Sequence, residues 1–349
     1  MTSPTLQDRI RRYGTDPAWL AQRHEEIIDP TLAIVDPHHH LWDFATNRYL
    51  LPELLGDTGS GHKIEQTVFV ECTAFYRAAG PAELRVVGET EFVNGVAAMA
   101  ASGRYGETQA CAGIVGYADL TVGAAVERVL GAHVAAGNGR FRGIRHAAGW
   151  DASDEVQNSH TNPPPELYRR ADFRQGFAKL RQFGLSFDVW LYHPQLGDVV
   201  DLARAFPDQP MVLDHVGGPL GIGPYAGHRD AIFRQWQRDI RALADCANVH
   251  VKLGGLGMKI CGFEFHKRAA PPSSEELAAL WRPYVETCIE SFGAERCMFE
   301  SNFPVDKVSC SYAVLWNAFK RLAAGASPAE KDALFRGTAA RFYRLGVST

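Results

Sequence analysis

The chain has 349 residues, a formal net charge of −4, 46% hydrophobic residues and 22% charged residues. This composition is typical of a globular protein, and without a basic excess we expect no nucleic-acid partner. No apolar run approaches the ~20 residues that span a bilayer, so we expect no membrane partner either. The start, Met1–Ile10, lacks the apolar centre of a signal peptide. Seven cysteines without a C-x-x-C pair indicate free thiols, and hence a cytoplasmic protein.

The first part of the chain differs from the rest. Residues 5–28 have helical spacing and many charges, and Pro30 ends the segment. We interpret residues 1–30 as an N-terminal helical extension and residues 31–349 as the main domain. The extension is also a candidate contact for a homodimer.

Eight short apolar segments rich in β-branched residues predict buried strands. They cover residues 33–38, 67–72, 111–116, 141–146, 186–192, 211–216, 249–253 and 297–302. Helical periodicity separates most of them, over residues 82–102, 122–136, 166–183, 229–246 and 274–292 and in a helix that reaches Phe206. Such alternation predicts an α/β fold, the (β/α)8 TIM barrel. A doubly wound sheet is the alternative, but histidines stand where its glycine-rich turn belongs. Residues 41–63 contain several glycines and are expected to form a long loop.

Polar side chains stand at the ends of the predicted strands, where barrel enzymes carry their active sites. They are His38, His40, Glu71, Arg145, His146, His193, His215, Lys252, Glu300 and Asn302. One histidine at a strand end is usually structural, but histidines end four separate strands, which favours a chemical role. Because side chains alternate along an extended chain, His38 and His40 point the same way and can hold a metal ion or polarise a carbonyl. We interpret His146 as structural.

The pattern Asp36-x-His38-x-His40, with His193, His215 and the run Phe299–Val305, resembles the amidohydrolase superfamily. Within it, the chain is similar to the amidohydrolase-2 branch, which contains 2-pyrone-4,6-dicarboxylate lactonase and sugar-acid lactonases. The resemblance extends from about residue 32 to the end of the chain. It implies that His38, His40 and His193 either bind one divalent metal ion, with zinc expected, or contact the substrate carbonyl directly.

The family also places an aspartate at the end of the eighth strand as general base, and this chain has Asn302 there. A neutral amide cannot accept a proton at pH 7 and is a poor zinc ligand. The base is then expected among Glu300, Asp306 and Glu71, because a carboxylate in a partly dry site can have a pKa near neutrality. The alternatives are an ion pair of Glu300 with Lys252 or Arg145, and a solvated Asp306.

Other residues near the predicted mouth are candidates for substrate binding. Arg145 and Lys252 can hold a substrate carboxylate, or instead form ion pairs with Glu71 or Glu300. The candidate pocket walls include Trp42, Phe75, Tyr76, Trp150, Trp190, Tyr192 and Phe303. The segments 151–165 and 254–272 are candidate lids or subunit contacts.

Together these features predict a hydrolase of a lactone or related cyclic ester that carries a carboxylate. Histidines at the barrel mouth would polarise the carbonyl for attack by water, and His215 would donate to the leaving group or position the substrate. The metal site is left open, with none or one divalent ion. A metal-dependent decarboxylase of the same branch is the alternative function, and a barrel that only binds a small ligand is a third.

Overall fold

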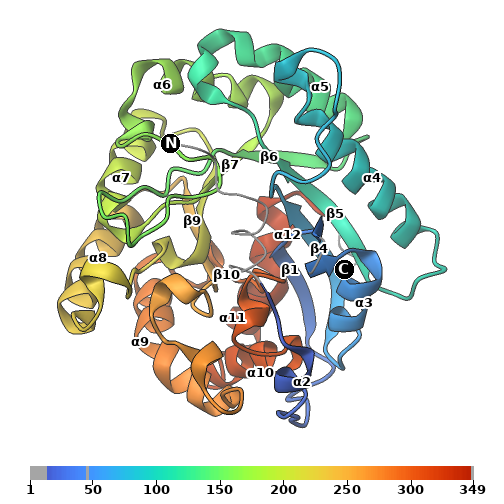
Figure 1. Cartoon of the computed structure of the whole chain (residues 1–349), viewed down its shortest axis with the longest axis vertical. Helices are drawn as coiled ribbons and strands as arrows, with labels where there is room; N and C mark the ends of the chain where they lie inside the picture. Colours follow the sequence, from blue (N-terminus) through green and yellow to red (C-terminus); the bar gives the residue numbers. More distant parts are fainter. Residues whose placement is uncertain (1–13, 45–46, 347–349) are drawn as a thin grey trace.

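The computed structural model describes residues 14–44 and 47–346. Eight parallel strands form one sheet that curves into a barrel (Figure 1). In order around the sheet they are β1 (Ala33–His39), β4 (Lys63–Val70), β5 (Gln109–Gly116), β6 (Phe141–Arg145), β7 (Ser186–Val189), β8 (Met211–Leu213), β9 (Val249–Leu253) and β10 (Cys297–Phe299). The backbone N–H groups of His40 and Asn302 donate to Phe303 at 2.8 Å and His38 at 2.9 Å, which joins the two ends of the sheet. The predicted TIM barrel is confirmed.

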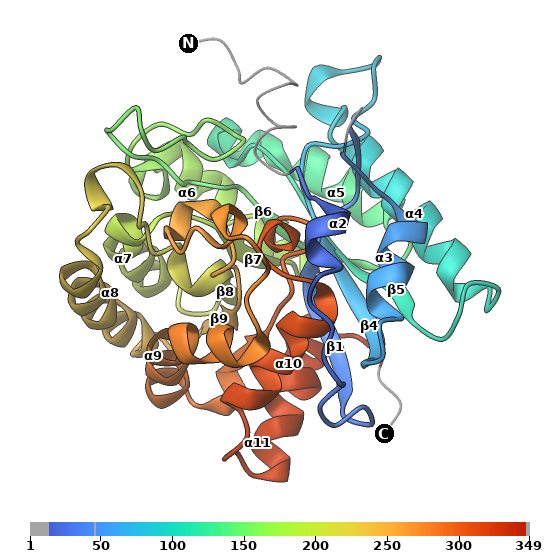
Figure 2. The same ribbon diagram turned by 60° about the horizontal axis from the view of Figure 1, so that its bottom comes forward.

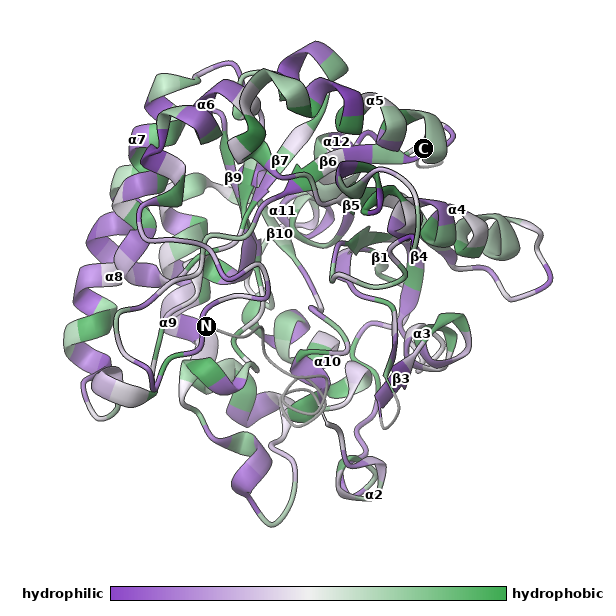
Figure 3. Ribbon diagram, turned by 45° about the horizontal axis from the view of Figure 1, so that its top comes forward, coloured by the Kyte–Doolittle hydropathy of each residue, from purple (hydrophilic) through white to green (hydrophobic). Residues whose placement is uncertain are grey.

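Helices surround the barrel and pack on the outer side of the strands (Figures 1 and 2). In chain order the described helices are α2 (Pro17–Leu20), α3 (Leu51–Thr58), α4 (Val87–Ala101), α5 (Glu127–Ala136), α6 (Ala171–Phe177), α7 (Leu196–Ala205), α8 (Arg229–Ala244), α9 (Ser274–Phe292), α10 (Tyr312–Leu322), α11 (Pro328–Asp332) and α12 (Thr338–Phe342). Of these, α12 packs against the barrel interior and not on its outer side. The outer helices carry polar residues beside apolar ones, while the strands are mostly hydrophobic (Figure 3). Successive strand residues therefore face either the helices or the barrel interior.

The barrel interior has its own apolar cluster, separate from the one between strands and helices. The strands contribute Val35, Val68, Val70, Val115, Val212 and Met298. These residues pack against Ala339, Phe342, Tyr343 and Leu345 of the C-terminal segment. Because this cluster fills one part of the interior, polar groups collect toward the carboxyl ends of the strands.

Two predicted segments have a different structure. Residues 41–63, expected as a loop, form the hairpin of β2 (Trp42–Phe44) and β3 (Asn47–Tyr49) followed by α3. That expectation was wrong because Leu51 and Leu54 are buried and hold a helix despite the nearby glycines. The segment predicted as one helix over 166–183 is also divided, into short 3₁₀ turns on either side of α6.

Only part of the N-terminal extension falls within the described residues, since residues 1–13 lie outside them. From residue 14 on, α2 is its one helix, and residues 23–27 run without regular structure. Glu25 accepts a hydrogen bond from the backbone of Ser274 at 2.7 Å, and the Ile28 backbone donates to Asn317 at 2.9 Å. The extension therefore lies against α9 and α10 (Figure 2). Within the described part of the chain, no helix is long and apolar enough to cross a membrane.

Candidate active site

A cavity lies at the carboxyl ends of the strands, as expected for a barrel enzyme. The strand ends contribute His40, Cys72, Thr73, Arg145, Trp190, His215 and Asn302 to its wall. The two predicted lids contribute Gln157, Ser159 and His160 from one segment and Met258, Lys259 and Ile260 from the other. Trp42, Phe44, Val305 and Val308 complete it. Both insertions therefore shape the cavity, and its wall combines apolar surface with several basic groups.

His215 and Glu300 form a hydrogen-bonded pair at this cavity. The Nδ1 atom of His215 lies 2.7 Å from a Glu300 carboxylate oxygen, and the backbone N–H of His215 donates to the same oxygen at 2.9 Å. Burial alone would raise the pKa of Glu300, but His215 and His38 outweigh it and lower the pKa to about 2. Glu300 is therefore ionised at neutral pH. Because Glu300 contacts Nδ1 of His215, the Nε2 atom of this ring is available to a ligand in the cavity.

Glycines after β9 make room for this pair. A Cβ atom at Gly255 would clash with the side chain of His215, and one at Gly254 would lie 2.5 Å from the Glu300 side chain. His215 itself has a φ of 55°, in the left-handed region that non-glycine residues rarely adopt. The segment 254–257 therefore packs against His215 and Glu300. The cavity wall begins at the residue that follows this segment, Met258.

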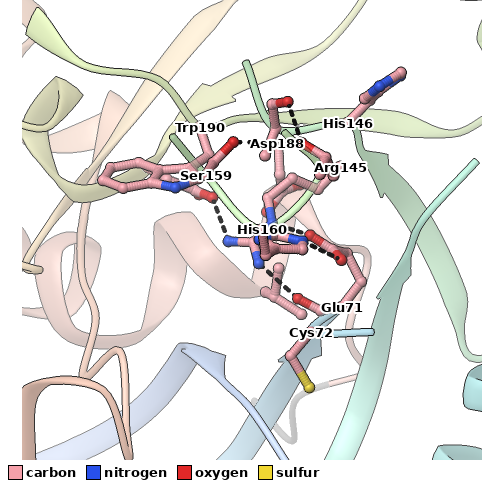
Figure 4. Close-up of polar contacts among 12 residues, drawn as sticks. Glu71, Cys72, Arg145, His146, Ser159, His160, Asp188 and Trp190 are labelled. Atoms are coloured by element: carbon pink, nitrogen blue, oxygen red, sulfur yellow. Dashed lines mark hydrogen bonds and ion pairs between the residues drawn. The ribbon is translucent and has the colours of Figure 1, made fainter. Parts of the chain in front are cut away.

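Arg145 lines the same cavity and forms a buried group with Glu71 and His160 (Figure 4). Its Nε atom donates to Glu71 at 2.7 Å, and His160 Nε2 lies 2.8 Å from the other oxygen of Glu71. Burial would raise the pKa of Glu71, but His160 and Arg145 lower it to about 2. His160 thereby joins the 151–165 insertion to the barrel. Figure 4 shows His146 pointing away from this group.

Lys252 lies beneath the cavity and is fully buried. Its Nζ atom is 2.7 Å from Asp188, 2.9 Å from Asp214 and 3.1 Å from His38 Nδ1. Burial lowers the pKa of Lys252, but Asp188 and Asp214 outweigh it, and the pKa is raised above its usual value. The side chain is therefore a charged ammonium group at the floor of the site.

His38 and His40 are in direct contact, with their Nε2 atoms 3.3 Å apart. His40 Nδ1 donates to the backbone oxygen of Val70 at 2.8 Å, which fixes the proton of the neutral ring on that atom. Burial, followed by the charge of Lys252 for His38 and of Arg145 for His40, lowers both pKa values well below their usual value. Both imidazoles are therefore neutral at physiological pH.

Asn302 and Asp306 are linked at the edge of the cavity. Asn302 Nδ2 donates to Asp306 at 2.8 Å, and the other Asp306 oxygen accepts from the Gly257 backbone at 2.9 Å. Burial raises the pKa of Asp306 to about 7. The amide oxygen of Asn302 is buried at the cavity without a hydrogen-bond partner among the described residues, so it is an acceptor available to a ligand.

The structure does not bring every sequence-predicted residue to the cavity. His193 Nδ1 accepts a hydrogen bond from the Leu220 backbone at 3.2 Å, and its ring packs against Tyr225 rather than against His38 or His40. Tyr192 donates to the backbone of Gln157 at 2.5 Å and so supports the 151–165 insertion. Tyr76 and Lys252 are absent from the cavity wall, whereas Trp42 lines it and stacks on His40.

Several residues at the site were not singled out from the sequence. Asp188 and Asp214 lie at strand ends, and their alternation with apolar neighbours was a usable signal. His160 lies in a polar insertion with no periodicity, and nothing in the pattern of residues 151–165 distinguished it.

A metal ion needs several side-chain ligand atoms that converge on one point. Among the described residues, His38, Asp214 and His215 have ligand atoms within 4.8 Å of one another. Two of these side chains already contact the Lys252 ammonium, and Arg145 lies 3.4 Å from His38 Nε2. Lys252 and Arg145 already occupy the two oxygens of Asp214, and His215 Nδ1 is paired with Glu300 at 2.7 Å. The donor set therefore does not fit a metal ion in this arrangement.

Comparison with known proteins assigns the chain to a protein family. The family model Amidohydro_2, described as amidohydrolase, matches residues 35–345. The chain belongs to this amidohydrolase family. It is 36% identical to the uncharacterized protein y4mH of Sinorhizobium fredii over 331 residues, covering 90% of this chain and 99% of that protein.

Two further relatives of this amidohydrolase carry more specific descriptions. It is 30% identical to the L-fucono-1,5-lactonase of Burkholderia multivorans over 240 residues, covering 67% of this chain and 72% of that protein. A crystal structure of an amidohydrolase from Burkholderia multivorans with bound zinc matches with a TM-score of 0.68 and 25% identity, covering 90% of this chain and all of that chain. The family and the relative named as a lactonase identify the chain as an enzyme, an amidohydrolase-family hydrolase.

Proposed function

We propose that this enzyme hydrolyses the ester bond of a sugar-acid lactone or a related lactone that carries a carboxylate. The observation that carries the proposal is the His215–Glu300 pair at the cavity, with Nδ1 and the carboxylate oxygen 2.7 Å apart. A carboxylate that orients an imidazole in this way makes the opposite ring nitrogen an effective general base. The relative named L-fucono-1,5-lactonase supports a sugar-acid lactone as substrate.

In this mechanism His215 Nε2 takes a proton from water as the water attacks the lactone carbonyl carbon. Glu300 stabilises the resulting imidazolium through Nδ1. When the ring ester bond breaks, His215 returns the proton to the leaving alkoxide, and the product is a hydroxy acid. The unpartnered amide oxygen of Asn302 accepts a hydrogen bond from the water or from a substrate hydroxyl.

Arg145 is the group that stabilises negative charge on the carbonyl oxygen. It lines the cavity and is charged, whereas the cavity histidine His40 is neutral and already donates its proton to Val70. Lys259 also lines the cavity and adds positive charge near its mouth. The positive electrostatic potential from Arg145 and Lys259 suits a substrate that carries a carboxylate. Free cysteines throughout the chain support a reducing compartment, the cytoplasm.

The test is acid release from a panel of sugar-acid lactones, with CO2 release from aromatic acids measured in parallel. We expect lactone hydrolysis, and a fall in kcat of roughly 10³–10⁴-fold in His215→Asn. His146→Asn is the matched control, because His146 also ends a strand but does not line the cavity. CO2 release without lactone hydrolysis, or an unchanged kcat in His215→Asn, would contradict the proposal.

A further inference from the structure

His160 lines the cavity, but the proposed mechanism gives it no role. It comes from the 151–165 insertion, and its side chain is 19% exposed. Its Nε2 atom lies 2.8 Å from Glu71, which is fully buried. Because the Glu71 carboxylate is ionised and can only accept, Nε2 of His160 carries a proton. Nδ1 has no hydrogen-bond partner among the described residues, so it is the polar atom of this ring that a ligand can contact.

The contact with Glu71 is not needed to attach the insertion to the barrel. On one side of His160, the Ser159 backbone N–H donates to the Gly149 oxygen at 2.7 Å. On the other side, the Thr161 hydroxyl donates to the Ala147 oxygen at 2.8 Å. The chain is thus fixed to the segment after β6 both before and after His160. The buried carboxylate therefore serves to orient the imidazole ring.

The same carboxylate places His160 next to Arg145. One oxygen of Glu71 accepts from Arg145 Nε at 2.7 Å, and the other contacts His160, so the three side chains form one group (Figure 4). In the proposed function Arg145 contacts the carbonyl oxygen of the lactone. His160 then lies beside the carbonyl, where a sugar-acid lactone carries a hydroxyl group on the neighbouring carbon. A hydroxyl group donates and accepts, so it pairs with Nδ1 of either the neutral or the cationic ring, whereas a carboxylate pairs only with the cation.

We propose that His160 is a specificity-determining residue whose Nδ1 atom binds the hydroxyl group on the carbon next to the lactone carbonyl. Glu71 is the positioning residue that orients the ring for this contact. The inference rests on the proposed function, because that function places Arg145 at the carbonyl oxygen. It narrows the substrate class to 2-hydroxy lactones. The barrel strands then supply the catalytic groups, and the 151–165 insertion supplies selectivity.

The test compares two ligands, the 1,5-lactam of a sugar acid and its 2-deoxy counterpart. A lactam keeps the ring and the carbonyl but resists hydrolysis, so titration calorimetry measures binding separately from catalysis. We expect the wild type to bind the hydroxylated lactam about 10-fold more tightly, as one hydrogen bond allows. Equal affinities, or no binding of either lactam, would overturn the proposal.

Two substitutions of His160 separate recognition of the hydroxyl group from attachment of the insertion. In His160→Gln the side-chain amide can replace Nε2 at Glu71, but no atom replaces Nδ1. In His160→Asn a polar atom stands near the position of Nδ1, and the side chain is too short for Glu71. We expect the affinities for the two lactams to lie within about twofold in His160→Gln and to differ about threefold in His160→Asn. A preference that persists in His160→Gln, or an equal loss in both variants, would overturn the proposal.

The matched control is Asn158→Ala in the same insertion. Asn158 Nδ2 donates to Asn162 at 3.1 Å, and Asn158 does not line the cavity. We expect this variant to keep the wild-type preference, and its loss there would contradict a specific role of His160. Lactone hydrolysis without a hydroxyl preference refutes this inference and leaves the proposed function intact. A preference that depends on His160, without hydrolysis of any lactone, refutes the proposed function alone.

Discussion

Two layers of the barrel interior differ sharply in character although the same strands supply both. On β10, Met298 belongs to the apolar inner cluster, while Glu300, two residues later, is a buried ionised carboxylate. At β8, Val212 belongs to the same cluster, and Asp214 follows it as a partner of Lys252 and Arg145. Because alternate side chains share a face, each pair points inward at successive depths.

The two layers contribute differently to the stability of the folded protein. The lower layer removes apolar surface from water and stabilises the fold. The upper layer buries ions that gain little net stability from one another, since desolvation offsets their attraction. The charged layer is therefore explained by chemistry at the cavity. Substitutions in the charged layer should therefore lower activity, and substitutions in the apolar layer should lower stability.

The largest expected effect is on catalysis in the charged layer. Glu300→Gln keeps the shape of the side chain but cannot stabilise an imidazolium, and its amide can drive His215 into the wrong tautomer. We expect kcat on the best lactone to fall by roughly 10³–10⁴-fold, measured in steady-state assays. Circular dichroism should show a folded protein. Activity within tenfold of the wild type would exclude Glu300 as the partner of the base.

The matched change in the apolar layer is Met298→Ala. Met298 is fully buried, and truncation leaves a cavity beneath the charged layer. We expect a loss of roughly 2–5 kcal/mol in the free energy of unfolding, measured by urea denaturation, with little change in kcat. A large fall in kcat without a loss of stability would show that the two layers are not separate in function.

The boundary between these layers also separates what could be predicted from what could not. Apolar β-branched runs identified all eight barrel strands, because burial on both faces leaves a strong local pattern. Strand ends identified His38, His40, Arg145 and His215 as neighbours, since a barrel brings those ends together. The contacts that these residues make with Lys252 and Glu300 depend on the folded structure, and no spacing in the sequence encodes them.

Residues supplied from outside the strands were harder to predict. His160 contacts Glu71 from a segment without periodicity. His193 follows a barrel strand, but its ring packs against Tyr225. Loop geometry decides both outcomes, and it depends on tertiary contacts such as the hydrogen bond from Tyr192 to Gln157.

A smaller effect concerns Glu89, a buried carboxyl near the charged layer. It accepts hydrogen bonds from the backbones of Cys72 and Ala74, and burial, followed by repulsion from Glu71, raises its pKa to about 8. Because the folded protein holds this proton more tightly than the unfolded chain, the wild type loses stability as the pH rises from about 4.5 to 8. We expect Glu89→Gln to remove roughly 2–4 kcal/mol of that loss. Urea unfolding at pH 5 and pH 8 measures it, and an equal pH dependence in both proteins would show that Glu89 is ionised throughout.

The smallest effect is expected where the two layers meet. The ring of Tyr343 packs in the apolar cluster, and its hydroxyl donates to Asp188 at 2.6 Å. Tyr343→Phe keeps the packing and removes one hydrogen bond to a charged group, so we expect a loss of roughly 1.5–3 kcal/mol in stability. Asp188 keeps its ion pair with Lys252, and kcat should stay within a few-fold of the wild type. A fall in kcat comparable to that of Glu300→Gln would mean that catalysis depends on the hydrogen bond from Tyr343 to Asp188, and not only on the ion pair between Asp188 and Lys252.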